Sequence, residues 1–503
     1  MFSPSSKMLI FQLVSCAFLL TSAAALSTVK HFGSLSGHEG TKRGLNDFVA
    51  KKESLQGVES KKIVQKLDHL TLSLKDTWEQ HYAQNFEFYD GNNLIFLMVG
   101  GYMDMNIGWL RQGFMAEQAE KFKAAIFAIE HRFYGESQPK PDLKTKSLKY
   151  LSSEQALADY AHFIQTMNAE HGFKNPKWVV FGVSYAGSLA AWLRYKYPHL
   201  VHSAVSANAP LLAKVDFHEY FESVSKTLAS IGGPECVDTI TTANKIMSEK
   251  IVNDANQYDE LFELCDPLSG SKNDISSFFW NLANQLVTAV EFMEEDEIKY
   301  SCEILTDKNI ADPVHRYAEF SKQTNYDFCL HANYSDMIHR WRLNKISYTE
   351  GWGARQWFYQ TCTEFGWFAT SSRKNNLLGD KVTVDFYDNI CKDIFDVKFD
   401  TKFVENAVKK TNEKYRGLDL PVTGVIFVHG TNDPWSKVGI TKFPKKGSIA
   451  IRIKGGGHYG VLLPESPYDS EQLKNARARI AKTLERWTKT KKFEPEKSAI
   501  IDV

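Results

Sequence analysis

The stretch Gly182-Val183-Ser184-Tyr185-Ala186-Gly187 decides the fold of this chain. It follows a short apolar run, residues 178–181, and precedes a helix-compatible segment, residues 188–195. A strand that enters a tight turn of small residues with serine at its apex, and then continues as a helix, is how α/β-hydrolases present a nucleophile. The usual pattern is Gly-x-Ser-x-Gly, whereas here Ala186 comes first and the second glycine is Gly187. Ser184 therefore needs partners elsewhere in the chain.

The composition is that of a well-packed globular protein. The 503 residues are 43% hydrophobic and 13% aromatic, which argues against disorder. This length allows one large domain with a big insertion, or roughly two to three ordinary domains. The 60 Lys and Arg residues equal the 60 Asp and Glu residues, so nothing favours nucleic acid or an anionic membrane as a partner.

The N-terminus resembles a secretory signal. Lys7 precedes an apolar run at 8–20, and small residues follow at 23–25. We predict a cleavable signal over 1–25, since the apolar run is short for a membrane anchor, which is the alternative. Residues 26–60 are polar and weakly periodic, and we predict a flexible leader or propeptide there, with order beginning near Val64. No later stretch is long and apolar enough for a membrane span.

Secretion changes how the cysteines are interpreted. Cys16 leaves with the signal, and an even number remains, which suggests three disulfides in an oxidising compartment. The residues alone leave the pairing open, and no spacing suggests a zinc site. Asn333 begins a single N-glycosylation sequon, Asn333-Tyr334-Ser335. The remaining cysteines are Cys236, Cys265, Cys302, Cys329, Cys362 and Cys391.

Apolar runs alternate with helical patterns before and after a middle region, about residues 215–415, that lacks this alternation. Near-continuous apolar strands of this kind indicate a parallel sheet covered on both faces. The middle region looks largely helical and carries all six remaining cysteines. We predict an α/β-hydrolase core at 61–214 and 416–503, with a helical, disulfide-bonded cap inserted at 215–415. The predicted strands are 94–99, 124–129, 178–181, 203–207, 423–428 and 448–453.

Two late strands lead into an acid and a base. The strand ending at 428 is followed by Asp433, and the strand ending at 453 is followed by His458 in a Gly-rich loop. The order Ser184, Asp433, His458 is the order of an α/β-hydrolase triad. The imidazole would take the serine proton, and the carboxylate would orient the imidazole. Asp433 alone could be a turn residue and His458 a loop residue, and His429 is a rival base.

The predicted oxyanion hole uses backbone groups. One N–H group should come from Tyr185, and a second from the loop after strand 94–99, near Gly101 or Tyr102. The cluster Glu130-His131-Arg132 lies at another strand end and has either a catalytic role or that of a structural salt-bridge motif.

These residues resemble the serine peptidases of the lysosomal Pro-X carboxypeptidase and dipeptidyl-peptidase II type. The resemblance covers about residues 60 to 490, and residues 184–192 are similar to the thymus-specific serine protease branch. The motifs that carry it are Gln65-Lys66-Leu67-Asp68-His69, Glu130-His131-Arg132-Phe133-Tyr134-Gly135-Glu136-Ser137, residues 150–159, residues 182–187, Tyr359-Gln360-Thr361-Cys362-Thr363-Glu364-Phe365-Gly366 and Asn432-Asp433-Pro434-Trp435.

The resemblance implies the triad of Ser184, Asp433 and His458 and a helical cap that narrows the active-site cleft. Some members of the family cleave after proline. We interpret Trp435 and Tyr185 as aromatic walls of the substrate pocket, with core packing as the alternative for either. One departure concerns the loop after Gly100-Gly101, where Tyr102 replaces the acidic residue that the family usually has. The disulfides that the resemblance implies are Cys236–Cys302, Cys265–Cys329 and Cys362–Cys391.

We therefore expect a secreted or lysosomal serine exopeptidase that acts on peptides through an acyl-enzyme. We expect no metal or other cofactor and no nucleic-acid or membrane partner. A homodimer is one assembly that the sequence allows. A carboxylesterase or lipase on the same fold is the first alternative, because a triad by itself does not distinguish ester from amide substrates. A catalytically silent hydrolase-fold binding protein is the second alternative, suggested by Tyr102.

Overall fold

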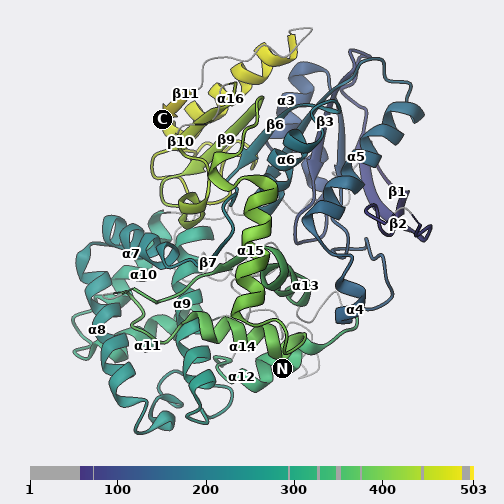
Figure 1. Cartoon of the computed structure of the whole chain (residues 1–503). Helices are drawn as coiled ribbons and strands as arrows, with labels where there is room; N and C mark the ends of the chain where they lie inside the picture. Colours follow the sequence, from purple (N-terminus) through teal and green to yellow (C-terminus); the bar gives the residue numbers. More distant parts are fainter. Residues whose placement is uncertain are drawn as a thin grey trace, which may run out of the picture. The chain divides into compact units, whose positions relative to one another are not determined.

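A computed structural model of the chain forms two compact units, each described here by itself (Figure 1). Within the residues that the structure describes, the sheet unit comprises 57–213 and 407–503, and the helical unit comprises 214–406. The predicted signal and nearly all of the predicted leader lie outside the described residues. The structure describes residues 57–71, 73–292, 295–325, 329–346, 353–373, 376–442, 444, 447–489 and 499–503.

The sheet unit is built on one nine-stranded sheet. Its strand order is β1-β2-β4-β3-β5-β6-β9-β10-β11, and only β2 runs against its neighbours in the described part of the sheet. The parallel strands are apolar over nearly their whole length, as strands buried on both faces must be. The strands are β1 (Val58–Lys66), β2 (Thr77–Asn85), β3 (Leu94–Val99), β4 (Ala125–Ile129), β5 (Lys177–Val183), β6 (Val201–Ala207), β9 (Val425–Gly430), β10 (Ile449–Ile453) and β11 (Ala499–Asp502).

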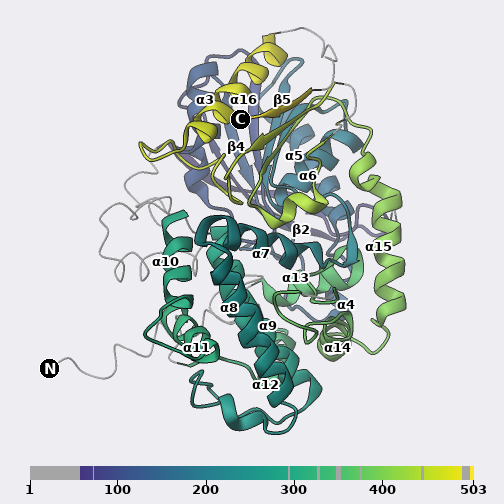
Figure 2. The same cartoon turned by 90° about the vertical axis from the view of Figure 1, so that its left-hand side faces the viewer.

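Helices cover both faces of this sheet. Figure 2 shows α3 and α16 on one face and α5 and α6 on the other. Phe114 of α3 and Leu484 of α16 belong to one buried cluster with strand residues such as Phe181. On the opposite face, Phe163 of α5 packs edge-on against Phe127 of β4. The helices of the unit are η3 (Ile107–Leu110), α3 (Phe114–Phe122), α4 (Thr145–Leu148), α5 (Ser153–Glu170), α6 (Tyr185–Lys196), η6 (Gly417–Asp419), η7 (Pro434–Val438) and α16 (Glu471–Lys489).

The helical unit has only a short parallel pair of strands among its described residues, β7 (Lys214–Asp216) with β8 (Gly366–Phe368). Its helix α8 packs against α7 and α11. The boundary between the units falls inside α15 (Thr401–Tyr415). The other helices are α7 (Glu219–Gly232), α8 (Pro234–Lys250), η4 (Ala255–Tyr258), α9 (Lys272–Phe292), α10 (Glu295–Leu305), α11 (Pro313–Thr324), α12 (Tyr334–Arg342), α13 (Ala354–Gln360), η5 (Thr361–Phe365) and α14 (Val384–Ile394).

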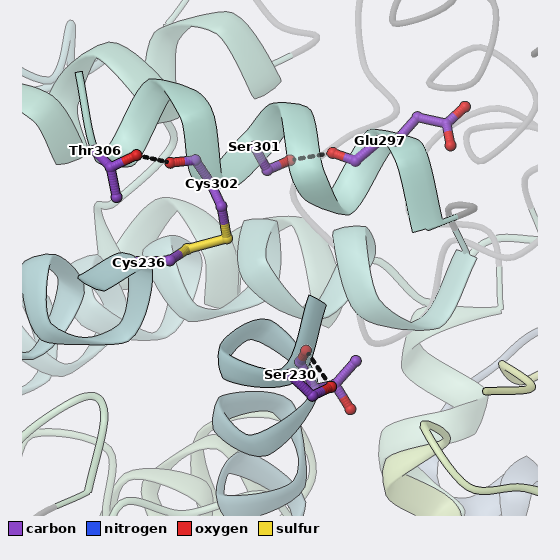
Figure 3. Close-up of a disulfide and its surroundings, with 7 residues drawn as sticks. Ser230, Cys236, Glu297, Ser301, Cys302 and Thr306 are labelled. Carbon is purple, nitrogen blue, oxygen red and sulfur yellow. Dashed lines mark hydrogen bonds between the residues drawn. A yellow bond between two sulfur atoms is a disulfide. The ribbon is translucent and has the colours of Figure 1, made fainter. Parts of the chain in front are cut away.

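Three disulfides tie the helical unit together. Figure 3 shows the one that joins Cys236 of α8 to Cys302 of α10. A Cβ atom at Gly232 would lie 2.1 Å from the Cys302 sulfur, so the chain needs glycine there for this bridge to form. The pairs are Cys236–Cys302, Cys265–Cys329 and Cys362–Cys391, as the family resemblance implies.

The expected fold class is confirmed: an α/β-hydrolase sheet interrupted, between β6 and β9, by a helical and disulfide-bonded insertion. All six predicted strands are present, with ends displaced by up to two residues. The predicted domain bounds, with a cap at 215–415, stay a prediction. Three features were not anticipated. The first strands, β1 and β2, form an antiparallel pair, β1 begins at Val58 within the predicted leader, and β11 extends the sheet at its far edge.

Among the described residues, none of the helices has both the length and the apolar character that crossing a membrane requires.

Candidate active site

Ser184 lies at the turn between β5 and α6. Its backbone has φ 59° and ψ −132°, a conformation that is strained for a residue other than glycine. Its N–H donates to the carbonyl of Ala207 at 2.9 Å, which ties the turn to the end of β6. A Cβ atom at Gly182 would lie 2.2 Å from the Ala186 carbonyl oxygen, and one at Gly187 would lie 2.7 Å from the Ala207 carbonyl oxygen. Both glycines are therefore required by close approach of the backbone.

The alanine that breaks the usual pattern faces the loop after β3. A Cβ atom placed on Gly101 would lie 3.4 Å from the Cβ of Ala186, which is an ordinary van der Waals distance. Ala186 therefore lies close to the backbone of this loop.

Asp433 and His458 meet as the order of the strands predicts. His458 Nδ1 lies 2.9 Å from Asp433 Oδ1, and both side chains are almost fully buried. The two loops approach closely, because a Cβ atom on Gly430 at the end of β9 would lie 2.1 Å from the Gly456 carbonyl oxygen. Strands β5, β6, β9 and β10 are neighbours and parallel, so their carboxyl ends bring the serine, the acid and the base to one edge of the sheet.

Asn208 connects the serine turn to the acid, and the sequence analysis missed it. It follows β6 directly, next to the carbonyl that binds the Ser184 N–H. Its side-chain Nδ2 donates to Asp433 Oδ2 at 2.7 Å and to the Gly457 carbonyl at 3.1 Å. Asn208 adopts φ 49°, a left-handed conformation that asparagine tolerates better than most residues. The sequence feature that could have identified Asn208 is its position, because it is a polar residue immediately after a predicted strand.

The surroundings of Asp433 keep it ionised. Burial by itself would raise the pKa of this carboxyl, but the neighbouring His458 and the hydrogen bonds from His458 and Asn208 lower it below its usual value. Its Oδ1 also accepts from the backbone N–H of Trp435 at 3.0 Å. Asp433 can therefore act as the fixed negative partner of an imidazolium.

His429, the rival base, is buried at the end of β9 with 1% of its surface exposed. Burial lowers the pKa of His429 to about 4, which keeps the ring neutral at neutral pH. Neither ring nitrogen has a hydrogen-bond partner among the described residues. A Cβ atom at Gly439 would lie 2.4 Å from its Nε2. The side chain thus fills a closed space beside Asp433, where nothing orients it for proton transfer.

The residues expected to form the oxyanion hole gather around the serine. Tyr185 is the first residue of α6, so its N–H lies at the partially positive end of the helix. Gly101 and Tyr102 line the same pocket as Ser184. The Tyr160 hydroxyl donates to the Gly100 carbonyl at 2.9 Å and so holds the start of this loop. Their role as oxyanion donors stays a prediction.

The pocket beside the serine has a volume of about 540 Å³ with its open mouth included. We call it the Ser184 pocket. It is lined by residues 98–106 with Trp109, Ile129, Val183, Ser184, Ala186 and Tyr459.

Asp104 and Tyr459 are among the side chains of the Ser184 pocket that the sequence analysis did not anticipate. The Tyr459 hydroxyl lies 3.3 Å from that of Tyr102. Trp435, expected in the substrate pocket, is not among the residues that line this one, and its ring lies 6.3 Å from that of His458. A part for Trp435 in substrate binding stays a prediction.

The residues of the Glu130-His131-Arg132 cluster bind buried residues that hold the fold together. The Arg132 guanidinium binds Asp159 through two hydrogen bonds of 2.6 and 2.7 Å, and both side chains are fully buried. His69 adds a third contact to the same carboxylate at 2.8 Å. His131 Nε2 lies 3.2 Å from the hydroxyl of Tyr185, the residue after the serine. Through this contact with Tyr185, the cluster helps to hold the serine turn in place.

In the helical unit, Asn333 caps α12, and its Oδ1 accepts from the Asp336 N–H at 2.9 Å. Cys265, Cys329 and His331 bring three ligand-type atoms within 4.8 Å of one another. The two sulfurs form a disulfide, so they are not available as metal-binding thiolates.

Comparison with known proteins identifies the family. Residues 65–480 match the model of the family described as serine carboxypeptidase S28. A Caenorhabditis elegans protein with a serine protease name is 33% identical over 453 residues, covering 85% of this chain and 83% of the relative. The thymus-specific serine protease of Mus musculus is 30% identical, covering 84% and 86%. The lysosomal Pro-X carboxypeptidase of Homo sapiens is 29% identical, covering 84% and 87%.

The family match spans most of the chain, and the serine, acid and base candidates lie at the strand ends where this fold carries its chemistry. The chain belongs to the S28 family of serine peptidases.

Proposed function

We propose that this protein is a serine exopeptidase that cleaves peptides through an acyl-enzyme formed on Ser184. The observation that carries the proposal is the buried pair of Asp433 and His458, 2.9 Å apart, at the same edge of the sheet as a serine in a strained turn. His458 would accept the serine proton during attack and return it to the leaving amine. Asp433 would hold the imidazole orientation and stabilise its charged form.

Backbone groups would stabilise the developing oxyanion. The N–H of Tyr185 and one N–H from Gly101 or Tyr102 are the donors that we propose. The loss of one such donor typically costs about 100- to 1,000-fold in kcat. Cleavage after proline is the finer part of the proposal, supported by relatives named Pro-X carboxypeptidase.

Labelling with a fluorophosphonate tests the nucleophile. The wild-type protein should be labelled, and Ser184→Ala should abolish labelling while leaving the thermal unfolding transition in place. Ser188→Ala is the matched control, since Ser188 lies on the same helix and its hydroxyl donates to the Pro210 carbonyl. Labelling of Ser184→Ala at the wild-type level would contradict the assignment.

A substrate panel tests the peptidase activity. Peptides with proline or alanine before the scissile bond, blocked at one end or the other, should be hydrolysed by the wild type and not by Ser184→Ala. Turnover of carboxylic esters without turnover of any peptide would favour the esterase alternative. A folded protein that is neither labelled nor active would favour the binding-protein alternative.

We also propose that the protein is secreted or lysosomal. Three disulfides in the helical unit suit an oxidising compartment, and relatives are named lysosomal. Ser335→Ala removes the sequon without touching the cap that Asn333 provides to α12. Expression in secretory cells should therefore give a wild-type protein whose mass falls on glycosidase treatment and a Ser335→Ala protein that glycosidase leaves unchanged. Cytosolic recovery of unglycosylated wild type would contradict this.

A further inference from the structure

Two tyrosine hydroxyls meet at the wall of the Ser184 pocket. Tyr102 belongs to the loop after β3, and Tyr459 belongs to the loop after β10. Their hydroxyl oxygens lie 3.3 Å apart, so one hydroxyl can donate to the other. Both residues line the pocket and both are half-buried, which distinguishes them from tyrosines packed in the core. The contact therefore joins two loops that are 357 positions apart in the chain.

The loop after β3 is held at two points and lies against the serine turn between them. The Gly100 N–H donates to the last carbonyl of β4 at 2.8 Å, and the Met105 N–H donates to Glu130 Oε1 at 3.3 Å. Between these points, a Cβ atom placed on Gly101 would lie 3.4 Å from the Ala186 backbone nitrogen. This stretch is also the one from which we propose the second oxyanion donor. A displacement of the stretch would move that N–H group away from the charge it must stabilise.

The loop after β10 carries the base and needs contacts with other parts of the chain to hold it. Three consecutive glycines precede His458, and their backbone has many accessible conformations. On the other side of the base, Arg477 donates to the Gly460 carbonyl at 2.8 Å. Tyr459 lies between these parts, and its ring packs edge-on against the ring of His458, with 4.7 Å between the ring centroids. The hydroxyl that reaches Tyr102 thus belongs to a side chain in direct contact with the imidazole.

Acyl transfer requires the base and the oxyanion donors to be placed together. During attack the base removes the serine proton while the donors bind the negative charge that develops on the carbonyl oxygen. A misplacement of about 1 Å can cost roughly 100-fold in rate. Asp433 holds the base at 2.9 Å, but that contact does not fix the loop after β3. The contact between the two tyrosines, which we call the tyrosine bridge, joins the two loops directly.

We propose that the tyrosine bridge holds the loop of the oxyanion donors in place relative to the base, which makes Tyr102 and Tyr459 positioning residues for acyl transfer. The proposal rests on the peptidase function proposed for Ser184. At 3.3 Å the bridge is longer than the usual separation of two hydroxyl oxygens, about 2.7–2.8 Å. Contacts of this kind often tighten only when substrate is bound. The effect of the bridge should therefore appear in the reaction rate more than in the stability of the free protein.

A double-mutant cycle on the full-length protein tests the bridge. The second-order rate of fluorophosphonate labelling would be measured for the wild type, Tyr102→Phe, Tyr459→Phe and the variant with both changes. Each single change removes one hydroxyl and keeps the ring, and it should slow labelling by roughly 3- to 10-fold, as the loss of one neutral hydrogen bond does. The double variant should be no slower than the slower single variant, since either change already breaks the bridge. Tyr468→Phe, at an exposed tyrosine further along the loop after β10, is the control and should be labelled at the wild-type rate.

Peptide kinetics separate a positioning role from a part in substrate binding. With a peptide that the wild type hydrolyses, kcat should fall in each single variant by a factor similar to that for labelling, while KM changes by less than about 2-fold. The thermal unfolding transition of each variant should stay in place, because the changes remove hydroxyls and leave the packing of the rings.

Three results would overturn the proposal. These are wild-type labelling rates in both single variants, effects that multiply in the double variant, and a rise in KM at unchanged kcat, which would assign the hydroxyls to substrate binding. The proposed function is judged separately by labelling of the wild type and of Ser184→Ala. A labelled wild type without coupling between the tyrosines would reject the bridge and leave the nucleophile standing. A wild type that is not labelled would reject the proposed function and, with it, any part of the bridge in acyl transfer.

Discussion

The sheet unit has no cysteine among its described residues, whereas those of the helical unit include six, joined in three disulfides. In the sheet unit, hydrogen bonds between strands tie together segments far apart in the chain, such as β6 with β9. Helices satisfy their backbone hydrogen bonds internally, so only side-chain packing and covalent bridges hold distant helices together. The comparison indicates that disulfides hold distant segments together in the helical unit, whereas hydrogen bonds between strands do so in the sheet unit.

The sheet unit has a different special feature, a buried ion pair. Arg132 and Asp159 are fully buried and doubly hydrogen-bonded, with His69 on the same carboxylate. Such a pair is weak support for stability while it is complete, but breaking it leaves an uncompensated buried charge. The units should therefore respond to different substitutions.

Arg132→Ala should have the largest effect on stability. It leaves the Asp159 carboxylate buried beside His69 alone, and the expected loss of unfolding free energy is about 3–5 kcal/mol. Denaturant unfolding would measure it. The control is Arg111→Ala, which breaks an exposed pair with Glu87 and should cost less than about 1 kcal/mol. Equal losses of unfolding free energy in the two variants would show that breaking the buried pair costs no more than breaking an exposed one.

Removing the Cys236–Cys302 bridge should have the next largest effect on stability. The double change Cys236→Ala with Cys302→Ala opens a loop of 66 residues and should cost about 2–4 kcal/mol. Hydrogen exchange should rise in the helical unit more than in the sheet unit. The shorter Cys362–Cys391 loop, of 29 residues, should cost roughly 0.7 kcal/mol less on loop entropy alone. Exchange that rises first in the sheet unit would contradict the comparison.

Asn208→Gly should affect chemistry more than folding. Glycine keeps the left-handed backbone and removes the hydrogen bonds to Asp433 and the Gly457 carbonyl. Loss of a bond to a charged group predicts a fall of roughly 10-fold or more in kcat or in the labelling rate, with KM little changed. Asn93→Gly is the matched control, another left-handed asparagine in the sheet unit. An unchanged labelling rate for Asn208→Gly would remove Asn208 from the positioning of the acid.

Glu130→Gln should give an effect of another kind, a change in the pH dependence of stability. Because the pKa of Glu130 is raised from 4.5 to about 7 in the folded protein, the folded state binds more protons than the unfolded state between these values. Its contribution to stability should then fall as pH rises from about 4.5 to 7. The unfolding free energy should therefore fall less between the two ends of this pH range in Glu130→Gln than in the wild type. Glu136→Gln, at an exposed carboxylate, is the control, and a variant slope equal to the wild-type slope would refute the prediction.

Local patterns were sufficient for much of the fold and for the main candidates of the site. Apolar runs predicted β3 and its parallel partners, because a strand buried on both faces needs apolar side chains throughout. The β1–β2 pair was missed, since its strands alternate in burial and carry many polar residues. Strand β11 is short and at the edge, so it has little apolar signal of its own.

The sequence by itself determined the strained serine turn, the chain order of serine, acid and base, and the family. Each depends on residue types at fixed spacing, which the backbone translates directly into local geometry. Only the tertiary structure decided that Asn208 reaches Asp433 across 225 positions, that Gly101 lies close to Ala186, and that Asp104 shares a pocket with Ser184. Such contacts arise from the lateral order of strands β3, β5, β6 and β9, which the chain order does not contain.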